Sequence, residues 1–273
     1  MELIVFDLDG TLLNSSSIIS NYTRDTLRLL SEKNITYTVA TGRTLHSASS
    51  IISSNHFTFP HIYTNGVIVW DPSKKSVDIN NCLALSEIQH VLRAAKSQNV
   101  TPFIFITSDD GSHYFYHLED LSTIEQQLLK DFLSRDKLNQ DKLSNINENS
   151  NITNISLIAS AEKIDAIEKD ISNEQHLITY SGQAIEGMGY KWMDVHHHAA
   201  SKGGAIETLK KQYNITKVIC FGDSDNDLSM FDIADESYAP ENANDTIKSA
   251  ATSIIGHHND DGVANFLRDR FKL

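Results

Sequence analysis

A short apolar run that ends directly in two carboxylates constrains this chain more than any other feature. Leu3–Phe6 is apolar at every position, and Asp7 and Asp9 follow it at once. An unbroken apolar run of this length is typical of a parallel strand that is buried on both faces. Two like charges about 4 Å apart repel by about 4 kcal/mol at an effective dielectric constant of about 20. The sequence therefore predicts a cationic group close to the end of its first strand.

Short apolar runs alternate with helix-like segments over the first 70 residues, and the alternation resumes after about Tyr190. This β-α-β-α-β order predicts an α/β fold with a doubly wound, mostly parallel, Rossmann-like sheet. Strands are expected at residues 3–6, 37–40, 61–63 and 217–221, and helices at 21–33, 47–54, 204–213, 228–233 and 263–271.

The middle of the chain has a different order, in which a helix and two strands occur twice. This pattern predicts an α+β domain inserted into the first one, with the core domain formed by residues 1–81 and 190–273 and the insertion by 82–189. Its helices are expected at 86–98, 121–135 and 162–171, its strands at 102–107, 113–117, 152–159 and in two short runs up to about 186, and a polar surface loop at 136–151.

Composition excludes several classes of protein. Of the 273 residues 40% are hydrophobic, which argues against disorder, and 23 basic against 36 acidic residues give a net charge of −13. That balance disfavours nucleic acid and anionic membranes as partners. Cys82 and Cys220 are the only cysteines, so a disulfide scaffold and a cysteine-based zinc site are excluded. Without a leader-like start or an apolar run of roughly 20 residues, a soluble cytoplasmic protein is expected.

A second acidic cluster follows another buried strand. The run Cys220–Asp227 places Asp223, Asp225 and Asp227 within five residues of one another. Oxygen ligands at this density suit Mg²⁺, which binds through one or two carboxylates and keeps several waters. The alternative is a helix N-terminus, where acidic side chains interact favourably with the helix dipole, and both interpretations can hold together.

Two smaller clusters point to phosphate. Thr41, Gly42 and Arg43 follow a predicted strand, and a hydroxyl, a flexible backbone amide and a guanidinium together suit a phosphate group. Lys202 begins a predicted helix, where its charge opposes the helix dipole and calls for an anionic partner. Taken singly, an ordinary turn and a solvated surface lysine are the simpler interpretations.

The four clusters occur in an order that resembles the haloacid dehalogenase-like superfamily. The motifs DLDGT, ATGR, SKG and GDSDND match those of the family in their order along the chain. The tail also resembles the family in Pro240–Ala243 and Asn259–Val263. Within it the chain resembles the Cof-type phosphatases, whose large α/β cap, called type IIB, is inserted between the second and third motifs. The resemblance covers nearly the whole chain.

The resemblance implies a role for each residue of the motifs. Asp7 would be the nucleophile that forms an aspartyl-phosphate, and Asp9 the general acid and then the general base. Mg²⁺ would be held by Asp7, by the backbone carbonyl of Asp9 and by Asp223, with support from Asp227. The transferring phosphoryl group would be bound by Thr41, Gly42, Arg43, Lys202 and Asn226.

We therefore predict a Mg²⁺-dependent phosphomonoester hydrolase that acts on small soluble phosphates, with sugar phosphates favoured by the resemblance. A sugar phosphomutase on the same scaffold and a phospho-accepting signalling module are the alternatives. A monomer or a weak homodimer is expected.

Two further features of the sequence are left open. The tract His196–His198 resembles a metal site, but successive strand residues point to opposite faces, so a solvated or hydrogen-bonded strand end is favoured. The pair Asn65–Gly66 is either a simple turn or part of a contact between the two domains.

Overall fold

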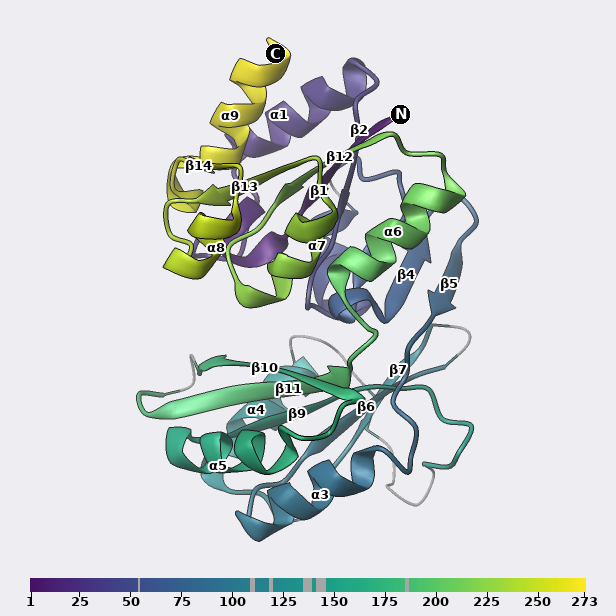
Figure 1. Ribbon diagram of the computed structural model, residues 1–273, viewed down its shortest axis with the longest axis vertical. Coiled ribbons are helices and arrows are strands. Elements are labelled where there is room, and N and C mark those ends of the chain that lie inside the picture. Colours follow the sequence, from purple (N-terminus) through teal and green to yellow (C-terminus); the bar gives the residue numbers. More distant parts are fainter. Residues whose placement is uncertain (54, 109–110, 118–119, 135–138, 141–145, 185–186) are drawn as a thin grey trace. The chain divides into compact units, whose positions relative to one another are not determined.

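The structure is a computed structural model that describes residues 1–53, 55–108, 111–117, 120–134, 139–140, 146–184 and 187–273. The chain forms two units, which we call the core unit (Met1–Asp78 and Ser201–Leu273) and the cap unit (Ile79–Ala200). Figure 1 labels their helices and strands. Among the described residues, no helix has both the length and the apolar character that crossing a bilayer requires.

The core unit is built on a parallel five-stranded sheet with the order β14-β13-β12-β1-β2. Its strands are β1 (Glu2–Phe6), β2 (Thr36–Val39), β12 (Lys217–Phe221), β13 (Glu236–Pro240) and β14 (Ser253–Ile255). Its helices are α1 (Asn21–Glu32), α2 (Leu45–Ile52), α6 (Lys202–Gln212), α7 (Leu228–Ile233), α8 (Asp245–Ala250) and α9 (Gly262–Phe271).

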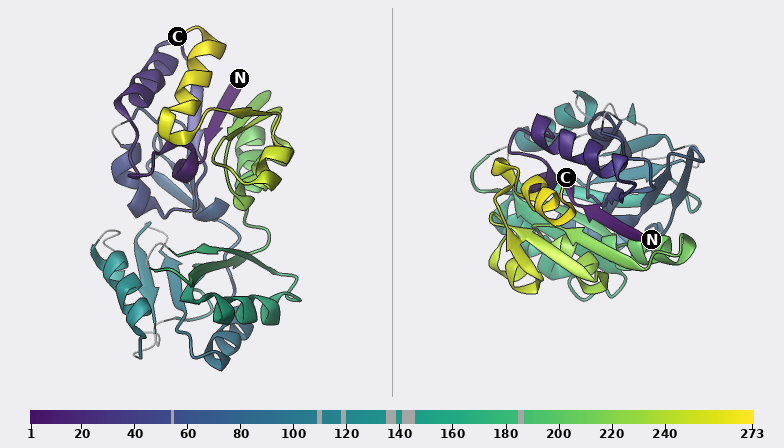
Figure 2. Two further views of the ribbon diagram at one scale, coloured as in Figure 1. Left: turned by 90° about the vertical axis from the view of Figure 1, so that its left-hand side faces the viewer. Right: turned by 90° about the horizontal axis from the view of Figure 1, so that it is seen from above.

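Helices on both faces of this sheet explain why Leu3–Phe6 of its first strand is an unbroken apolar run. Leu3 and Val5 of β1 belong to the hydrophobic cluster that includes side chains of α6 and α7. On the other face, the ring centroids of Phe6 and Phe221 are 5.4 Å apart, and Phe221 lies 5.7 Å from Phe266 of α9. Figure 2 shows α1 and α9 side by side, in agreement with their packing contacts. The predicted doubly wound α/β fold is thus present.

A second, smaller sheet in the core unit was not predicted beyond its first strand. It has the order β3-β4-β5, formed by β3 (His61–Tyr63), β4 (Ile68–Asp71) and β5 (Ser76–Ile79). A parallel bridge between Ala40 and Ile62 joins it to the end of β2. The antiparallel pairing of β3 with β4 creates a tight turn at residues 64–66.

The cap unit contains a six-stranded sheet with the order β10-β11-β9-β6-β7-β8, antiparallel except between β7 and β8. Its strands are β6 (Phe103–Thr107), β7 (His113–Tyr116), β8 (Asn139–Gln140), β9 (Ile152–Ser160), β10 (Leu177–Gln183) and β11 (Tyr190–His197). Its helices are α3 (Ile88–Ser97), α4 (Thr123–Ser134) and α5 (Ala161–Ile171).

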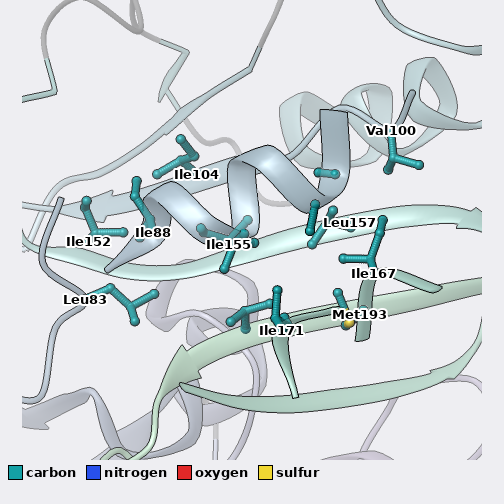
Figure 3. Close-up of a cluster of buried hydrophobic side chains, with 14 of the residues drawn as sticks. Leu83, Ile88, Val100, Ile104, Ile152, Ile155, Leu157, Ile167, Ile171 and Met193 are labelled. Atoms are coloured by element: carbon teal, nitrogen blue, oxygen red, sulfur yellow. The ribbon is translucent and has the colours of Figure 1, made fainter. Parts of the chain in front are cut away.

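Alternation along β6 gives the cap sheet two different faces. Ile104 and Ile106 point into the cluster formed with α3 and α5, which Figure 3 shows in close-up. Phe103 and Phe105 point the other way, where they pack with Phe115 and with side chains of α4. The cap unit therefore has hydrophobic cores of its own.

The predicted limits of the insertion need correction at its C-terminal end. Residues 190–200, which the sequence assigned to the core domain, lie in the cap unit because β11 pairs with both β9 and β10. At the other end the division falls after Asp78 rather than after residue 81. The predicted polar loop 136–151 contains the short strand β8, which pairs with β7. No local sequence pattern reveals that pairing. Residues 136–138 and 141–145 lie outside the described part of the chain.

Gly203 lets α6 approach α7, and this close approach gives a test of the fold. A Cβ atom at Gly203 would lie 2.0 Å from the backbone oxygen of Ser229. We expect Gly203→Ala to lower the free energy of unfolding by about 1–3 kcal/mol through overpacking, as measured by urea denaturation. The exposed neighbour is the matched control: Gly204→Ala should instead stabilise the helix by up to about 1 kcal/mol. Equal effects of the two substitutions would contradict the packing described here.

Asp194 on β11 gives the cap unit a pH-dependent stability. It lies opposite Ser156, whose hydroxyl donates to it, but burial raises the pKa of Asp194 to about 6. An unfolded aspartate titrates near 3.9, so between about pH 4 and 6 the folded state binds the extra proton and stability falls as pH rises. We expect the wild type to lose about 1–3 kcal/mol relative to Asp194→Asn over this interval in urea unfolding series. Parallel pH profiles for the two proteins would refute this.

Candidate active site

Three neighbouring strands of the core sheet end at one edge and carry the predicted residues there. Asp7 follows β1, Thr41 lies two residues beyond β2, and Asp223 lies two residues beyond β12. Because these strands are parallel and adjacent in the order β12-β1-β2, their carboxyl ends meet. Ligands in open α/β sheets bind at such an edge.

Lys202 is the cationic partner of the carboxylates, and it is fully buried. Its Nζ lies 2.6 Å from Oδ1 of Asp7 and 2.6 Å from Oδ1 of Asp227. The side chains of Lys202 and Asp227 have no exposed surface and that of Asp7 is 6% exposed. The first turn of α6 holds the lysine, because the Ser201 side chain accepts a hydrogen bond from the backbone N–H of Gly204. The simpler interpretation of Lys202 as a solvated side chain is therefore wrong.

One lysine does not neutralise this cluster. Burial raises the pKa of Asp7 well above its usual value; Lys202 opposes that shift, while Asp227 and Asp223 add to it. For Lys202 itself, burial would lower the pKa, but the two carboxylates outweigh burial and the pKa is raised. The cluster thus retains an excess of negative charge that a further cation would relieve.

Asp227 connects the lysine to the loop that carries Asp223. Its second oxygen, Oδ2, accepts hydrogen bonds from the backbone N–H groups of Asp223 (2.8 Å) and Ser224 (3.0 Å). Ser224 and Asp227 form a capping box at the short helix that precedes α7. The helix-terminus interpretation of this acidic run is therefore correct for Asp227. The same side chain also accepts a hydrogen bond from Lys202 in the buried cluster.

Asp223 is held against the loop after β1. Thr11 Oγ1 donates to Asp223 Oδ1 at 3.0 Å, and a Cβ atom at Gly10 would lie 2.3 Å from Asp223 Oδ2. Gly10 also has φ +74°, which only glycine adopts readily. Burial, followed by the charge of Asp227, raises the pKa of Asp223 to about 7.

The donor set suits a divalent cation that prefers oxygen. Asp7, Asp223 and Asp227 each offer one carboxylate oxygen, and these three atoms lie within 4.8 Å of one another. Hard oxygen ligands with an excess of negative charge are what Mg²⁺ and similar ions require. The side chain of Asp9 does not belong to this group.

Asp9 instead forms a bidentate ion pair with Arg43. Arg43 Nε and Nη2 donate to the two carboxylate oxygens of Asp9, each at 2.6 Å. The pair is accessible, with Asp9 54% and Arg43 21% exposed. Thr41 is buried below it, and its hydroxyl accepts from the backbone N–H of Arg43 at 3.1 Å. The Thr41–Arg43 turn thus presents a guanidinium next to the acidic cluster.

Asn226 leads to a residue for which the sequence indicated no site role. Its Nδ2 donates to Oδ1 of Asn65 at 2.9 Å, and its Oδ1 accepts from Ser224 Oγ at 2.8 Å. Thr64 and Asn65 have φ of 50° and 52°, in the left-handed region that is uncommon for residues other than glycine, above all for a β-branched residue such as Thr64. The left-handed Asn65–Gly66 turn was a detectable signal, but not its partner 161 residues away.

The histidine tract belongs to the cap unit, at the end of β11. His196 is buried, His197 is half-buried and His198 is exposed. Burial lowers the pKa of His196 to about 4, so it is neutral near pH 7. Among the described residues, the carboxylate triad is the only group of three or more such side chains whose ligand atoms lie within 4.8 Å of one another.

Removal of Lys202 tests its part in holding the site together. Lys202→Met leaves Asp7 and Asp227 buried without their cation, so we expect a loss of about 3–5 kcal/mol in the free energy of unfolding at pH 7. Lys210→Met is the matched control on the same helix. Lys210 Nζ lies 3.9 Å from Oδ2 of Asp235, and the two side chains are 35% and 43% exposed. Its loss should change the free energy of unfolding by less than about 1 kcal/mol. Urea denaturation measures both, and similar losses would disprove the special role of Lys202.

Comparison with known proteins identifies the family. The model of the haloacid dehalogenase-like hydrolases matches residues 4–267. A 5-amino-6-(5-phospho-D-ribitylamino)uracil phosphatase of Bacillus subtilis (strain 168) is 27% identical over 277 residues, covering 99% of this chain and 98% of that protein. The present chain shares its fold with a haloacid dehalogenase-like hydrolase from Bacteroides thetaiotaomicron (TM-score 0.79, 24% identity, 99% of both chains). It shares the fold also with a subclass IIB sugar phosphatase (TM-score 0.77, 18% identity, 100% of this chain and 99% of the other).

These findings confirm the predicted superfamily, the α/β fold with a type IIB cap, and the prediction of an enzyme, and the relatives' names agree with a phosphatase. Because the family model spans nearly the whole chain, the protein belongs to the haloacid dehalogenase-like hydrolase family.

Proposed function

We propose that the protein is a Mg²⁺-dependent phosphomonoester hydrolase that acts through an aspartyl-phosphate on Asp7. The observation that carries this proposal is the arrangement of the buried Asp7 and Lys202 with the half-buried Asp223 at the carboxyl edge of the core sheet. A carboxylate nucleophile divides one difficult displacement into two easier ones. Phosphoryl transfer otherwise depends on positioning and on neutralising charge, which this cluster is built to provide.

In the first step an oxygen of Asp7 attacks phosphorus, and the bond between phosphorus and the ester oxygen breaks. Asp9, two residues further on, gives its proton to the departing oxygen, so that an alcohol leaves. In the second step Asp9 takes a proton from water, the water oxygen attacks phosphorus, and Asp7 is released with inorganic phosphate. The 54% exposure of Asp9 agrees with a group that must exchange protons with substrate and water.

Arg43 connects the binding of phosphate with the freedom of Asp9. In the structure the guanidinium occupies both oxygens of Asp9. A phosphate dianion is a competing bidentate partner for arginine, so a substrate that reaches Arg43 would release the Asp9 carboxyl for proton transfer. Thr41, Gly42, Lys202 and Asn226 would bind the remaining phosphoryl oxygens.

Asp7, Asp223 and the backbone carbonyl of Asp9 would hold the cation, and Asp227 would support it. When bound, Mg²⁺ supplies charge neutralisation between the anionic nucleophile and the anionic phosphate. Asp227 is already occupied by Lys202 and two backbone amides, which favours a supporting role.

The substrate class rests on the relatives. One is named for the phosphate of a ribitylamino-uracil and another is called a sugar phosphatase. Small phosphorylated polyols and sugars are therefore the first compounds to test. We also propose a cytoplasmic location and a monomer or weak homodimer.

The decisive assay is a panel of phosphate esters with Mg²⁺ and with a chelator. We expect release of inorganic phosphate that chelation abolishes, and a loss on the order of 10³-fold or more in Asp7→Asn. The exposed Asp225 in the same acidic run provides the matched control, because Asp225→Asn should leave the rate nearly unchanged. Activity that survives Asp7→Asn would exclude the mechanism. An isomerised sugar phosphate as the product would indicate a mutase. A long-lived phosphoprotein without turnover would indicate a signalling module.

A further inference from the structure

The loop that carries Asp9 is tied to a segment more than 230 residues away in the chain. Between β13 and α9, the segment Asn242–Asp261 forms side-chain hydrogen bonds to the loop between β1 and α1 and to the first turn of α1. Both segments belong to the core unit. The roles assigned to the family motifs leave this contact unexplained.

Asn242 is the part of this segment closest to the proposed chemistry. Its Nδ2 donates to the backbone oxygen of Gly10 at 2.7 Å, and its Oδ1 accepts from the backbone N–H of His258 at 3.1 Å. Gly10 directly follows Asp9. Both ends of the amide are used, so the side chain has one defined orientation.

His258 holds the far end of the same turn. Its Nδ1 lies 2.7 Å from the backbone oxygen of Leu13, and because a carbonyl only accepts, Nδ1 carries the hydrogen. Leu13 in turn donates its N–H to the Leu8 oxygen at 2.8 Å, which closes the turn around Asp9. Asn242 and His258 therefore hold the turn at two of its carbonyl groups.

Asp9 needs such support because its own turn constrains it weakly. Asp9 and Gly10 have non-helical backbone angles inside this turn, with ψ 127° at Asp9 and φ 74° at Gly10. The Asp9 side chain is largely exposed, and the structure gives its carboxylate Arg43 as a partner. A partner that is exchanged during the reaction cannot keep the backbone of Asp9 in place.

We propose that Asn242 and His258 are positioning residues that place Asp9 for proton transfer, an inference that rests on the proposed phosphatase function. They touch neither the substrate nor the reacting atoms and act through the carbonyl groups of Gly10 and Leu13. A displacement of about 1 Å in a catalytic group can cost on the order of 100-fold in rate. Loss of their hydrogen bonds should therefore impair the general acid and spare binding of phosphate.

Asn242→Asp removes the donor to Gly10 and keeps the acceptor for His258, so it isolates one hydrogen bond. Asn265→Asp is the matched control, because Asn265 Nδ2 also donates to a backbone oxygen, that of Asp260 at 3.0 Å, and the change adds the same charge at an exposed position of α9. Each purified full-length protein is assayed at saturating Mg²⁺, so that a weaker contact of the cation with the Asp9 carbonyl does not limit the rate. The substrates are a sugar phosphate, whose leaving alcohol needs a proton, and p-nitrophenyl phosphate, whose leaving phenolate does not.

We expect Asn242→Asp to lower kcat/KM for the sugar phosphate by about 10- to 100-fold and for p-nitrophenyl phosphate by less than about threefold, since only the first reaction depends on the general acid. Inhibition by inorganic phosphate should be unchanged, and Asn265→Asp should resemble the wild type on both esters. A loss of equal size on both esters would show a general structural effect and overturn the proposal, as would unchanged kinetics.

A second pair decides the question if Asn242→Asp does not fold. His258→Leu removes the donor to Leu13, whereas His258→Asn offers an amide in place of Nδ1. We expect the selective loss with leucine and its recovery with asparagine, and equal activity of the two variants would count against positioning. A wild type that cleaves neither ester would refute the phosphatase function itself, which distinguishes the two failures.

Discussion

The ion pairs of Lys202 with Asp7 and Asp227 are the interaction on which the rest of the core unit depends. All three side chains are almost completely removed from water, where isolated charges are very costly. The lysine is held in the first turn of α6, one carboxylate at the end of β1 and the other next to α7. The sheet and both helices must therefore be in place together before any of these charges is compensated.

This buried cluster also limits what can surround it. Gly10 gives Asp223 the space it occupies, and Gly203 lets α6 lie against α7. Burial, reinforced by the neighbouring carboxylates, raises the pKa values of Asp7 and Asp223, and a cation bound here would stabilise their charged forms. The ion pair of Arg43 and Asp9, in contrast, is accessible to solvent at the Asp9 carboxylate. Separating these two charges therefore costs less, and an incoming phosphate can replace Asp9 as the partner of Arg43.

Most of the secondary structure could be predicted from the sequence because its signals are local. The apolar run of β1 and the polar residues after it indicated a buried parallel strand, and the alternation indicated helices on both faces. The limits of the cap unit could not be read in this way. Tyr190–His197 became a cap strand because it pairs with β9 and β10, and strands of similar pattern can pair in either domain.

By itself the sequence determined that Asp7, Thr41 and Asp223 gather at one edge, because each follows a strand of a parallel sheet. It also predicted a cationic group near Asp7. Only the tertiary structure decided that Lys202 is that cation, that Asn65 orients Asn226, and that Asn242 holds the turn after Asp9. These contacts join residues 161 to 232 positions apart, and no local pattern encodes such a distance because the packing of whole elements creates it.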